Sequence, residues 1–182
     1  ESIEQWARKK RYEFLMESFK KTKSKKILTA HHANDQIETI LINLSRGSGV
    51  LGLRGIDKKN KYLLRPLIGF KKKEIIEFSK RIKYKFLEDE TNKDLSIPRN
   101  FIRHKVVNPW EEQIPHLSNA FNKTIENISH WQLALDYFIN NFILSKINFQ
   151  DSGFSIEKNL IKDFPNLIKL RIIQLLIGSE EG

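Results

Sequence analysis

The chain has 182 residues, of which 40% are hydrophobic, and its formal net charge of +10 makes a polyanionic partner such as nucleic acid a hypothesis. Cysteine is absent and the five histidines show no zinc-like spacing, so a disulfide framework, a metal site and a cysteine nucleophile are not expected. No apolar run approaches the 18 residues of a membrane helix and no signal peptide is recognisable, so a soluble, cytoplasmic protein of one or two domains is predicted.

The first predicted element is an amphipathic helix over residues 1–20, whose apolar stripe contains Tyr12, Leu15 and Phe19. A basic loop over residues 20–26 follows. Such a lysine run is more often a solvated connector than an RNA-binding element, and both interpretations stay open. Residues 27–30 are a short apolar run, which indicates a buried strand of a parallel sheet.

A second helix is predicted to begin almost directly after this strand, with Asn34 as its N-cap and Gly47 at its end. Its apolar positions recur at helical spacing: Ile37, Ile40, Leu41 and Leu44. The stretch from Gly47 to Gly55 is rich in glycine and is predicted to be a loop.

Polar side chains cluster where the strand meets this helix. His31 and His32 are placed at the carboxyl end of a strand, where open α/β sheets bind ligands. Asp35 and Glu38 share the polar face of the first helical turn. There they either complement the helix dipole or converge on one cation or hydrogen-bonding group.

A βαβ unit is predicted next. Residues 62–67 form a strand that ends near Pro66, residues 71–82 a helix, and residues 85–88 another short strand. The inward face of this helix is predicted to carry four apolar side chains: Ile75, Ile76, Phe78 and Ile82.

The second informative stretch is a helix entered at Pro98. Arg99 and Arg103 then lie one turn apart on one face, a spacing that suits bidentate contacts to phosphate oxygens. The alternative is an arginine pair bridged to acids such as Glu88 or Asp89.

The rest of the chain is predicted to be helical after a break bracketed by Pro109 and Pro115. The helix from Leu117 to about Leu144 carries a stripe with a period of 3.6: Phe121, Thr124, Ile125, Ile128, Trp131, Leu135 and Phe138. After a turn at residues 151–153, a last helix begins at Phe164-Pro165. Its apolar positions are Leu167, Ile168, Leu170, Ile172, Leu175 and Leu176. Such stripes form a core far more often than a cofactor site.

Two motifs, in this order, carry a resemblance to a known family. Residues 31–39, His-His-Ala-Asn-Asp-Gln-Ile-Glu-Thr, and residues 46–49, Arg-Gly-Ser-Gly, closely resemble the first signature of tRNA(Ile)-lysidine synthetases, His-His-x-Asp/Asn-Asp-x-x-Glu-Thr and Arg-Gly-Ser/Thr-Gly. Residues 88–92 and 99–104 resemble the second, Asp-x-Ser/Thr-Asn followed by Arg-Asn-x-x-Arg-His. These enzymes are N-type ATP pyrophosphatases of the PP-loop family.

The resemblance extends over residues 2–109 and includes Arg65-Pro66-Leu67. It implies an α/β fold, in which residues 1–112 are the C-terminal part of a Rossmann-like, parallel-sheet PP-loop ATPase domain. Residues 113–182 are then a small helical tRNA-binding domain, expected to be incomplete. The family's pyrophosphate loop, Ser-Gly-Gly-x-Asp-Ser, does not occur in this sequence. We therefore expect an N-terminally truncated fragment that is inactive by itself.

The activity implied by the resemblance is that of a carbon–nitrogen ligase. With ATP and Mg²⁺ it joins L-lysine to C2 of the wobble cytidine of tRNA(Ile), giving lysidine through an adenylated tRNA and releasing diphosphate and AMP. No membrane is involved, and a homodimer is a further hypothesis. Two alternatives stay open. One is another PP-loop tRNA-modifying enzyme, such as a 2-thiocytidine synthetase, whose chemistry commonly uses cysteines. The other is a non-catalytic basic RNA-binding module.

The resemblance also implies roles for individual residues. The predicted catalytic residues are Asp35, Glu38, Arg99 and Arg103. Of these, Asp35 and Glu38 are expected to contact lysine or cytidine, because an acidic pair can hold an ammonium and take up its protons. The two arginines are expected at the α-phosphate. The predicted nucleotide-binding residues are His31, His32 and Arg46.

Overall fold

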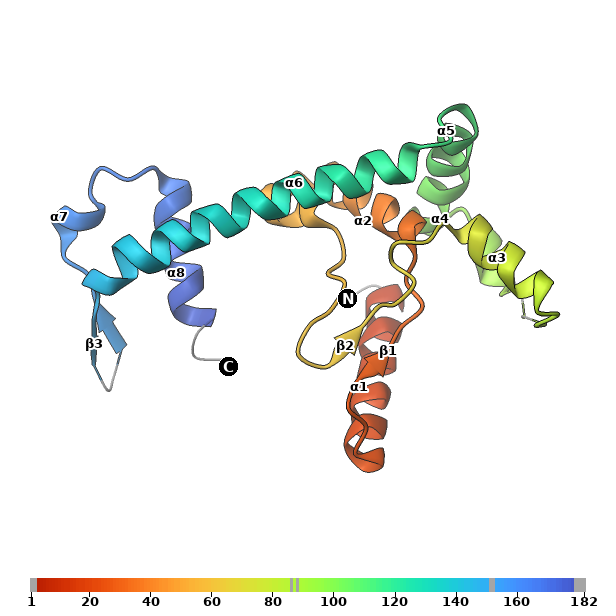
Figure 1. Ribbon diagram of the computed structural model, residues 1–182, viewed down its shortest axis with the longest axis horizontal. Helices are drawn as coiled ribbons and strands as arrows, with labels where there is room; N and C mark the ends of the chain where they lie inside the picture. Colours follow the sequence, from red (N-terminus) through yellow and green to blue (C-terminus); the bar gives the residue numbers. More distant parts are fainter. Residues whose placement is uncertain (1–2, 86, 88, 151–152, 179–182) are drawn as a thin grey trace. The chain divides into compact units, whose positions relative to one another are not determined.

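The computed structural model describes residues 3–85, 87, 89–150 and 153–178 (Figure 1). They form two compact units, residues 1–128 and residues 129–182. No helix in this described part of the chain is long and apolar enough to cross a membrane. The predicted domain boundary at residues 112/113 stays a prediction.

The first unit contains a small parallel sheet. β1 (Ile27–Leu28) pairs with β2 (Leu63–Leu64), with Ile27 opposite Leu63. Parallel strands need a crossover connection, which α2 (Ala33–Ser45) and η1 (Val50–Arg54) supply here. The mixed α/β class and the parallel pairing are confirmed, although both strands are shorter than predicted. Of the strand predicted at residues 85–88, Lys85 and Leu87 belong to no strand, and the other two residues lie outside the described part.

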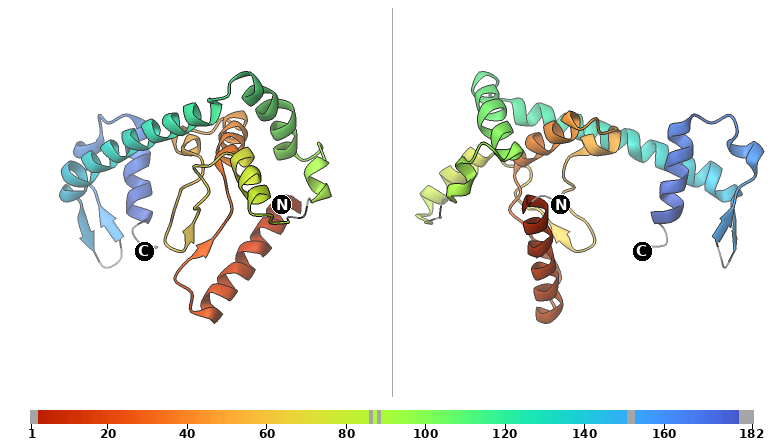
Figure 2. Two further views of the ribbon diagram at one scale, coloured as in Figure 1. Left: turned by 45° about the vertical axis from the view of Figure 1, so that its right-hand side comes forward. Right: turned by 180° about the vertical axis from the view of Figure 1, so that it is seen from behind.

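α1 (Ile3–Thr22) confirms the first predicted helix and lies beside β1, as two further views show (Figure 2). Its predicted apolar stripe is half-buried. The Phe19 ring meets the Tyr62 ring edge-on, with centroids 5.6 Å apart, so α1 is held against the start of β2.

α2 ends as predicted, because Gly47 has a φ of 69° just past the helix. Its start differs from the prediction, since His32 is the N-cap in place of Asn34. The Asn34 side chain is buried and makes other bonds. Its Oδ1 accepts from the Lys72 backbone N–H (2.9 Å) and its Nδ2 donates to Glu111 (2.7 Å). Leu44, predicted to face the core, is exposed.

α3 (Lys72–Arg81) confirms the helix predicted over residues 71–82. Ile75 and Ile76 are half-buried, but Phe78 and Ile82 are more than half exposed, contrary to the prediction. This inward face was predicted as part of a βαβ unit. The second strand of that unit is not found among the described residues.

The next segments are η2 (Glu90–Lys93), α4 (Pro98–Phe101), the π-helical η3 (Ile102–Val107) and α5 (Asn108–Gln113). The helix entry at Pro98 is confirmed. The break bracketed by Pro109 and Pro115 is confirmed, since α5 ends at Gln113 and the next helix begins at Leu117, but Pro109 itself lies inside α5. Proline lacks an N–H, so the preceding turn loses one helical hydrogen bond, and the chain accommodates this with a wider π turn.

The core of the first unit joins α2 to η3. Its buried centre is Ile37, Val107 and Leu117, against which Leu41, Ile102, Ile114 and Phe121 pack. Each such side chain contributes about 1.5–3 kcal/mol when fully buried. This packing holds the helix that carries Arg103 across from the first turn of α2.

α6 (Leu117–Phe138) begins in the first unit and enters the second at residue 129, where it continues through η4 (Ile139–Ile143) and η5 (Leu144–Lys146), as predicted for residues 117–144. Two strands that the sequence did not predict follow as an antiparallel pair, β3 (Asn148–Gln150) and β4 (Gly153–Ser155). α7 (Lys158–Ile161) and α8 (Asn166–Gly178) complete this unit. Two residues of the predicted turn, 151 and 152, lie outside the described part.

The core of the second unit consists of Ile139, Ile143, Ile147, Ile172 and Leu176. Several predicted core positions are exposed: Trp131, Phe138, Leu167 and Leu170. A stripe with a period of 3.6 is wider than the contact that one neighbouring helix covers, so its margins stay exposed.

Candidate active site

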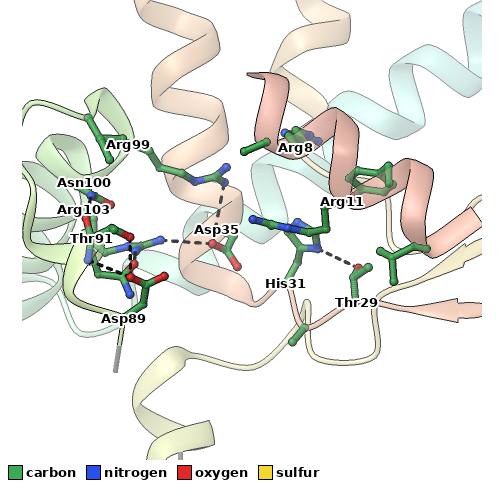
Figure 3. A pocket seen from close by; sticks show the side chains of 16 residues that line it. Arg8, Arg11, Thr29, His31, Asp35, Asp89, Thr91, Arg99, Asn100 and Arg103 are labelled. Atoms are coloured by element: carbon green, nitrogen blue, oxygen red, sulfur yellow. Dashed lines mark hydrogen bonds and ion pairs between the residues drawn. The ribbon is translucent and has the colours of Figure 1, made fainter. Parts of the chain in front are cut away.

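A cavity of about 580 Å³ lies in the first unit, at the carboxyl end of β1 (Figure 3). Its walls come from α1, the residues after β1, the first turn of α2, η2, α4 and the start of η3. Its ionisable side chains are Arg8, Arg11, Tyr12, His31, Asp35, Asp89, Arg99 and Arg103. The position matches the ligand site of open α/β sheets, and the volume suits a nucleotide-sized ligand.

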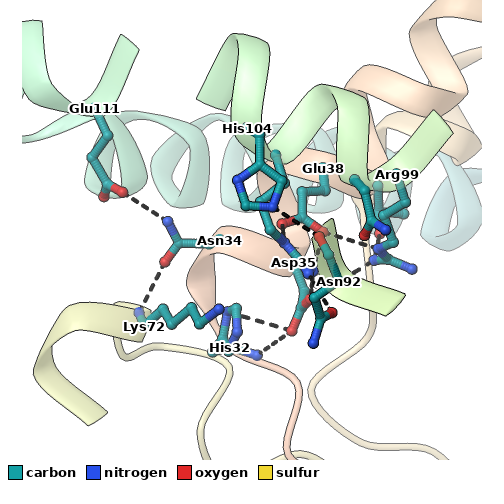
Figure 4. A network of polar contacts seen from close by, with 12 residues as sticks. His32, Asn34, Asp35, Glu38, Lys72, Asn92, Arg99, His104 and Glu111 are labelled. Carbon is teal, nitrogen blue, oxygen red and sulfur yellow. Dashed lines mark hydrogen bonds and ion pairs between the residues drawn. The ribbon is translucent and has the colours of Figure 1, made fainter. Parts of the chain in front are cut away.

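The Glu38 carboxylate is fully buried and binds both predicted arginines (Figure 4). Arg103 donates from Nε to Oε1 (2.7 Å) and from NH2 to Oε2 (2.9 Å), and Arg99 donates from Nε to Oε2 (2.9 Å). The arginine pair is therefore bridged to an acid, as one interpretation predicted, but the acid is Glu38. A buried carboxylate needs such partners, because an unpaired buried charge is strongly destabilising.

Asp35 differs from Glu38 because its side chain lines the cavity. Its Oδ2 accepts a hydrogen bond from the His32 backbone N–H (2.9 Å), which caps α2. Its Oδ1 lies 3.7 Å from Arg103 NH2 and 3.9 Å from Arg99 NH2. These distances are too long for hydrogen bonds. In the described part of the chain Oδ1 accepts none, so it can accept one from a ligand.

Further bonds fix the two arginines. Arg99 NH2 donates to Thr39 Oγ1 (3.0 Å), and Arg103 NH1 to Asn92 Oδ1 (3.3 Å). Burial alone would lower the pKa of Arg103, but the hydrogen bonds and charge of Glu38 outweigh it and raise that pKa. The guanidinium groups are thus held in place, charged, at the wall of the cavity.

The other polar residues of the Arg-Asn-x-x-Arg-His motif hold η2. The buried Asn100 amide donates to the carbonyls of Thr91 (2.8 Å) and Asp94 (3.0 Å). His104 Nε2 donates to the Asn92 carbonyl (2.9 Å). The motif therefore alternates between arginines at the cavity and side chains that fix the loop beside it.

The two histidines have different positions. His31 lines the cavity, with Nδ1 2.9 Å from Thr29 Oγ1. His32 caps α2, and its buried Nδ1 lies 3.4 Å from Asp35 Oδ2 without a hydrogen bond. Burial lowers the pKa of both imidazoles, and the Asp35 carboxylate only partly offsets it. Both are therefore neutral at pH 7.

The structure brings together most of the predicted site residues, but Arg46 is separate. Arg46 is exposed at the far end of α2 and does not line the cavity. Eleven helical residues place it about 16 Å from Asp35 along the axis. The contact between Arg46 and nucleotide stays a prediction, and Arg46 is not among the residues that line this cavity.

Two cationic residues of this cavity were not predicted as site residues from the sequence: Arg8 and Arg11 on α1. In Figure 3 they lie across Asp35 from Arg99 and Arg103. Their spacing of three residues, next to Tyr12 on the apolar stripe, was the available signal. It did not reveal that this helix face borders the end of β1.

A cavity lined by arginines at the end of a parallel strand is typical of an α/β domain that binds nucleotides. A family model described as the PP-loop domain matches residues 1–110. The chain belongs to the PP-loop domain family.

Curated relatives named tRNA(Ile)-lysidine synthase are similar to this chain. The protein of Thermosipho africanus (strain TCF52B) is 40% identical over 153 residues, which cover 84% of this chain and 34% of the relative. The protein of Thermotoga sp. (strain RQ2) is 37% identical over 78% of this chain and 32% of the relative. The protein of Staphylococcus aureus (strain MRSA252) is 32% identical over 98% of this chain and 43% of the relative. The chain thus spans one third to two fifths of their length, and the predicted resemblance is confirmed.

Proposed function

We propose that this chain contributes the nucleotide-facing part of a tRNA(Ile)-lysidine synthetase, an ATP-dependent carbon–nitrogen ligase. The names of the curated relatives and the PP-loop family support this assignment. The observation that carries it is one cavity in which the Asp35 carboxylate lies between arginines from two walls, Arg8 and Arg11 on one side and Arg99 and Arg103 on the other. The substrates are ATP, L-lysine and tRNA(Ile) with a wobble cytidine.

The reaction has two steps. The C2 carbonyl oxygen of the cytidine attacks the α-phosphorus of ATP, an O–P bond forms, and diphosphate leaves. The ε-amine of lysine then attacks C2, the C–O bond breaks, AMP leaves, and the nitrogen loses its protons. The first step needs cations around the phosphates, and the second needs a carboxylate that holds the ammonium and accepts a proton.

The phosphate-facing role falls to Arg99, Arg103, Arg8 and Arg11, whose side chains line one cavity. Guanidinium groups already held by Glu38 reorganise little when phosphate binds. Asp35 is the proposed lysine contact and base, since its Oδ1 faces the cavity. His31 is the candidate for a hydrogen bond to nucleotide or base.

We assign Glu38 a positioning role in place of the predicted contact with lysine. Both of its oxygens already accept hydrogen bonds from arginines, and its side chain is 0% exposed. An ammonium could reach this carboxylate only by displacing a guanidinium. Glu38 therefore acts on the reaction through Arg99 and Arg103.

A resident Mg²⁺ does not fit the described residues, which include no group of three or more carboxylate or imidazole side chains arranged to hold a metal. Magnesium bound by substrate phosphates needs only one or two protein carboxylates. The Mg²⁺ expected from the resemblance is thus assigned to the ATP substrate, and no step is derived through it.

The test is transfer of labelled L-lysine to a tRNA(Ile) transcript by the full-length protein with ATP. We expect incorporation that requires ATP and the wobble cytidine, with no incorporation when uridine replaces that cytidine. Lysine transfer that is independent of the wobble base, or tRNA binding without any transfer, would refute the proposal.

A further inference from the structure

Two lysine-rich stretches of the first unit lie outside the cavity. Residues 20–26 read Lys-Lys-Thr-Lys-Ser-Lys-Lys, residues 58–62 read Lys-Lys-Asn-Lys-Tyr, and neither contains Asp or Glu. The first precedes β1 and the second precedes β2. Because β1 and β2 are parallel, the segments that enter them lie at the same edge of the sheet. The pairing of the strands therefore gathers the two stretches.

Direct contacts fix this arrangement. Lys26 Nζ donates to the Lys61 carbonyl (2.8 Å), and the Ile27 backbone N–H donates to the Tyr62 carbonyl (2.8 Å). The Asn60 side chain accepts from the backbone N–H groups of Tyr62 (3.1 Å) and Leu63 (2.8 Å). Figures 1 and 2 show the end of α1 and the loop before β2 on the same side of the strand pair.

We name this surface the lysine edge. Its members are exposed side chains from both stretches: Lys23, Lys25, Lys26, Lys58, Lys59 and Lys61. Across the described residues, none of their ammonium groups is within ion-pair distance of a carboxylate. A surface of one charge sign without internal counter-charges attracts polyanions and releases their counterions when they bind.

The lysine edge lies at the end of β1 opposite the cavity. His31 is five positions after Lys26, so at most about 18 Å of extended chain joins the two surfaces. At about 3.4 Å per nucleotide along a duplex strand, this spans roughly five nucleotides. We propose that the lysine edge binds the phosphate backbone of the tRNA within about five nucleotides of the wobble base in the cavity. This inference rests on the proposed function.

The chemistry favours phosphate over the bases as the target. Flexible ammonium groups act as point charges for phosphate, whereas base readout needs planar donor and acceptor groups at fixed positions.

The test neutralises the lysine edge from both stretches at once, with Lys23→Gln, Lys25→Gln and Lys61→Gln in the full-length protein. These substitutions leave the Lys26 hydrogen bond in place. Binding of a tRNA(Ile) transcript is measured between low and moderate salt. We expect the slope of log K against log salt to become shallower by about 2, and affinity at about 0.1 M salt to fall roughly a hundredfold.

A matched control carries the same loss of charge elsewhere on the first unit, with Lys73→Gln, Lys80→Gln and Lys123→Gln, all exposed. We expect it to bind tRNA within about twofold of the parent protein, because these lysines lie outside the lysine edge. Lysidine formation at saturating tRNA should be unchanged in both variants, which separates a binding defect from a catalytic one.

Three outcomes would overturn the inference. The first is an unchanged salt slope in the variant of the lysine edge. If the parent protein binds tRNA and forms lysidine, this outcome leaves the proposed function intact. The second is an equal loss of affinity in the matched control. The third is unchanged tRNA binding with lost binding to phosphatidylserine vesicles, which would make the partner a lipid surface. A parent protein that binds no tRNA would instead refute the proposed function.

Discussion

Glu38 and Arg103 form a two-point ion pair, with Nε–Oε1 and NH2–Oε2 distances of 2.7 and 2.9 Å, around a carboxylate that has no exposed surface. The pair joins α2 to η3. Since Arg99 binds the same carboxylate, one buried acid orients two cations toward the cavity.

Replacing this acid should damage the fold as well as the site. Glu38→Gln leaves two partly buried guanidinium groups without their counter-charge, and we expect a loss of about 3 kcal/mol in the free energy of unfolding. Urea unfolding measures it. The exposed Glu112→Gln variant is the control and should change stability by less than about 0.5 kcal/mol. Equal stability of the two variants would contradict the structural role of Glu38.

Asp35→Asn should separate folding from chemistry. Asparagine can still accept the His32 backbone N–H, so we expect the melting temperature and tRNA affinity to change little. It cannot balance an ammonium or take up its proton, and the lost charge-assisted contact is worth about 1.5–3 kcal/mol, or roughly ten- to a hundredfold in lysine transfer. A variant with normal transfer would remove Asp35 from the chemistry.

The bond between Asn34 and Glu111 makes a charge-specific prediction. Asn34→Asp places a second carboxylate 2.7 Å from Glu111, and the repulsion should cost about 2–3 kcal/mol at pH 7. The loss should shrink as the pH falls, because one shared proton relieves the repulsion. Adding Glu111→Gln should restore most of the stability at pH 7. If the double variant is as unstable as the single one, charge is not the cause.

Stability should also depend on pH through His31 and His32. Burial lowers the folded-state pKa of both below the unfolded value of about 6.5, so below that pH the unfolded chain binds more protons. The unfolding free energy should therefore decline as the pH falls from about 7 through that value and into the region of the lowered pKa. Replacing both histidines by Gln should flatten this decline. An unchanged slope would show that neither histidine is linked to folding.

Much of this site follows from local sequence pattern. The apolar run before His31, the helical spacing after Asp35 and the one-turn separation of Arg99 and Arg103 depend on neighbours in the chain. They predicted the strand end, the polar face and the arginine pair. The burial of Glu38 and its ion pairs with the two arginines depend on how η3 packs on α2. No local sequence pattern encodes that packing.

The incorrect predictions have the same origin. Asn34 has the chemistry of an N-cap, but its amide satisfies Lys72 and Glu111, which are distant in sequence. Pro109 was predicted to border the break before the last helices, yet it lies inside α5 and the break begins only at Ile114, because the π turn before Pro109 accommodates the missing N–H. In the first case distant hydrogen bonds override the local preference for an N-cap, and in the second the adjacent π turn overrides the local preference for a helix end.

We assign adenylate formation to the arginines of the cavity and lysine transfer to Asp35. Single-turnover trapping of adenylated tRNA(Ile), by the full-length protein with ATP and without lysine, tests this division of roles. We compare Asp35→Asn with Arg11→Gln, whose exposed side chain lines the cavity without a structural bond among the described residues, and with Lys9→Gln as the control.

We predict that Asp35→Asn and Lys9→Gln accumulate the adenylate at close to the parental rate, whereas Arg11→Gln forms it about ten- to a hundredfold more slowly. Adenylation that stops in Asp35→Asn and proceeds normally in Arg11→Gln would contradict this division of roles.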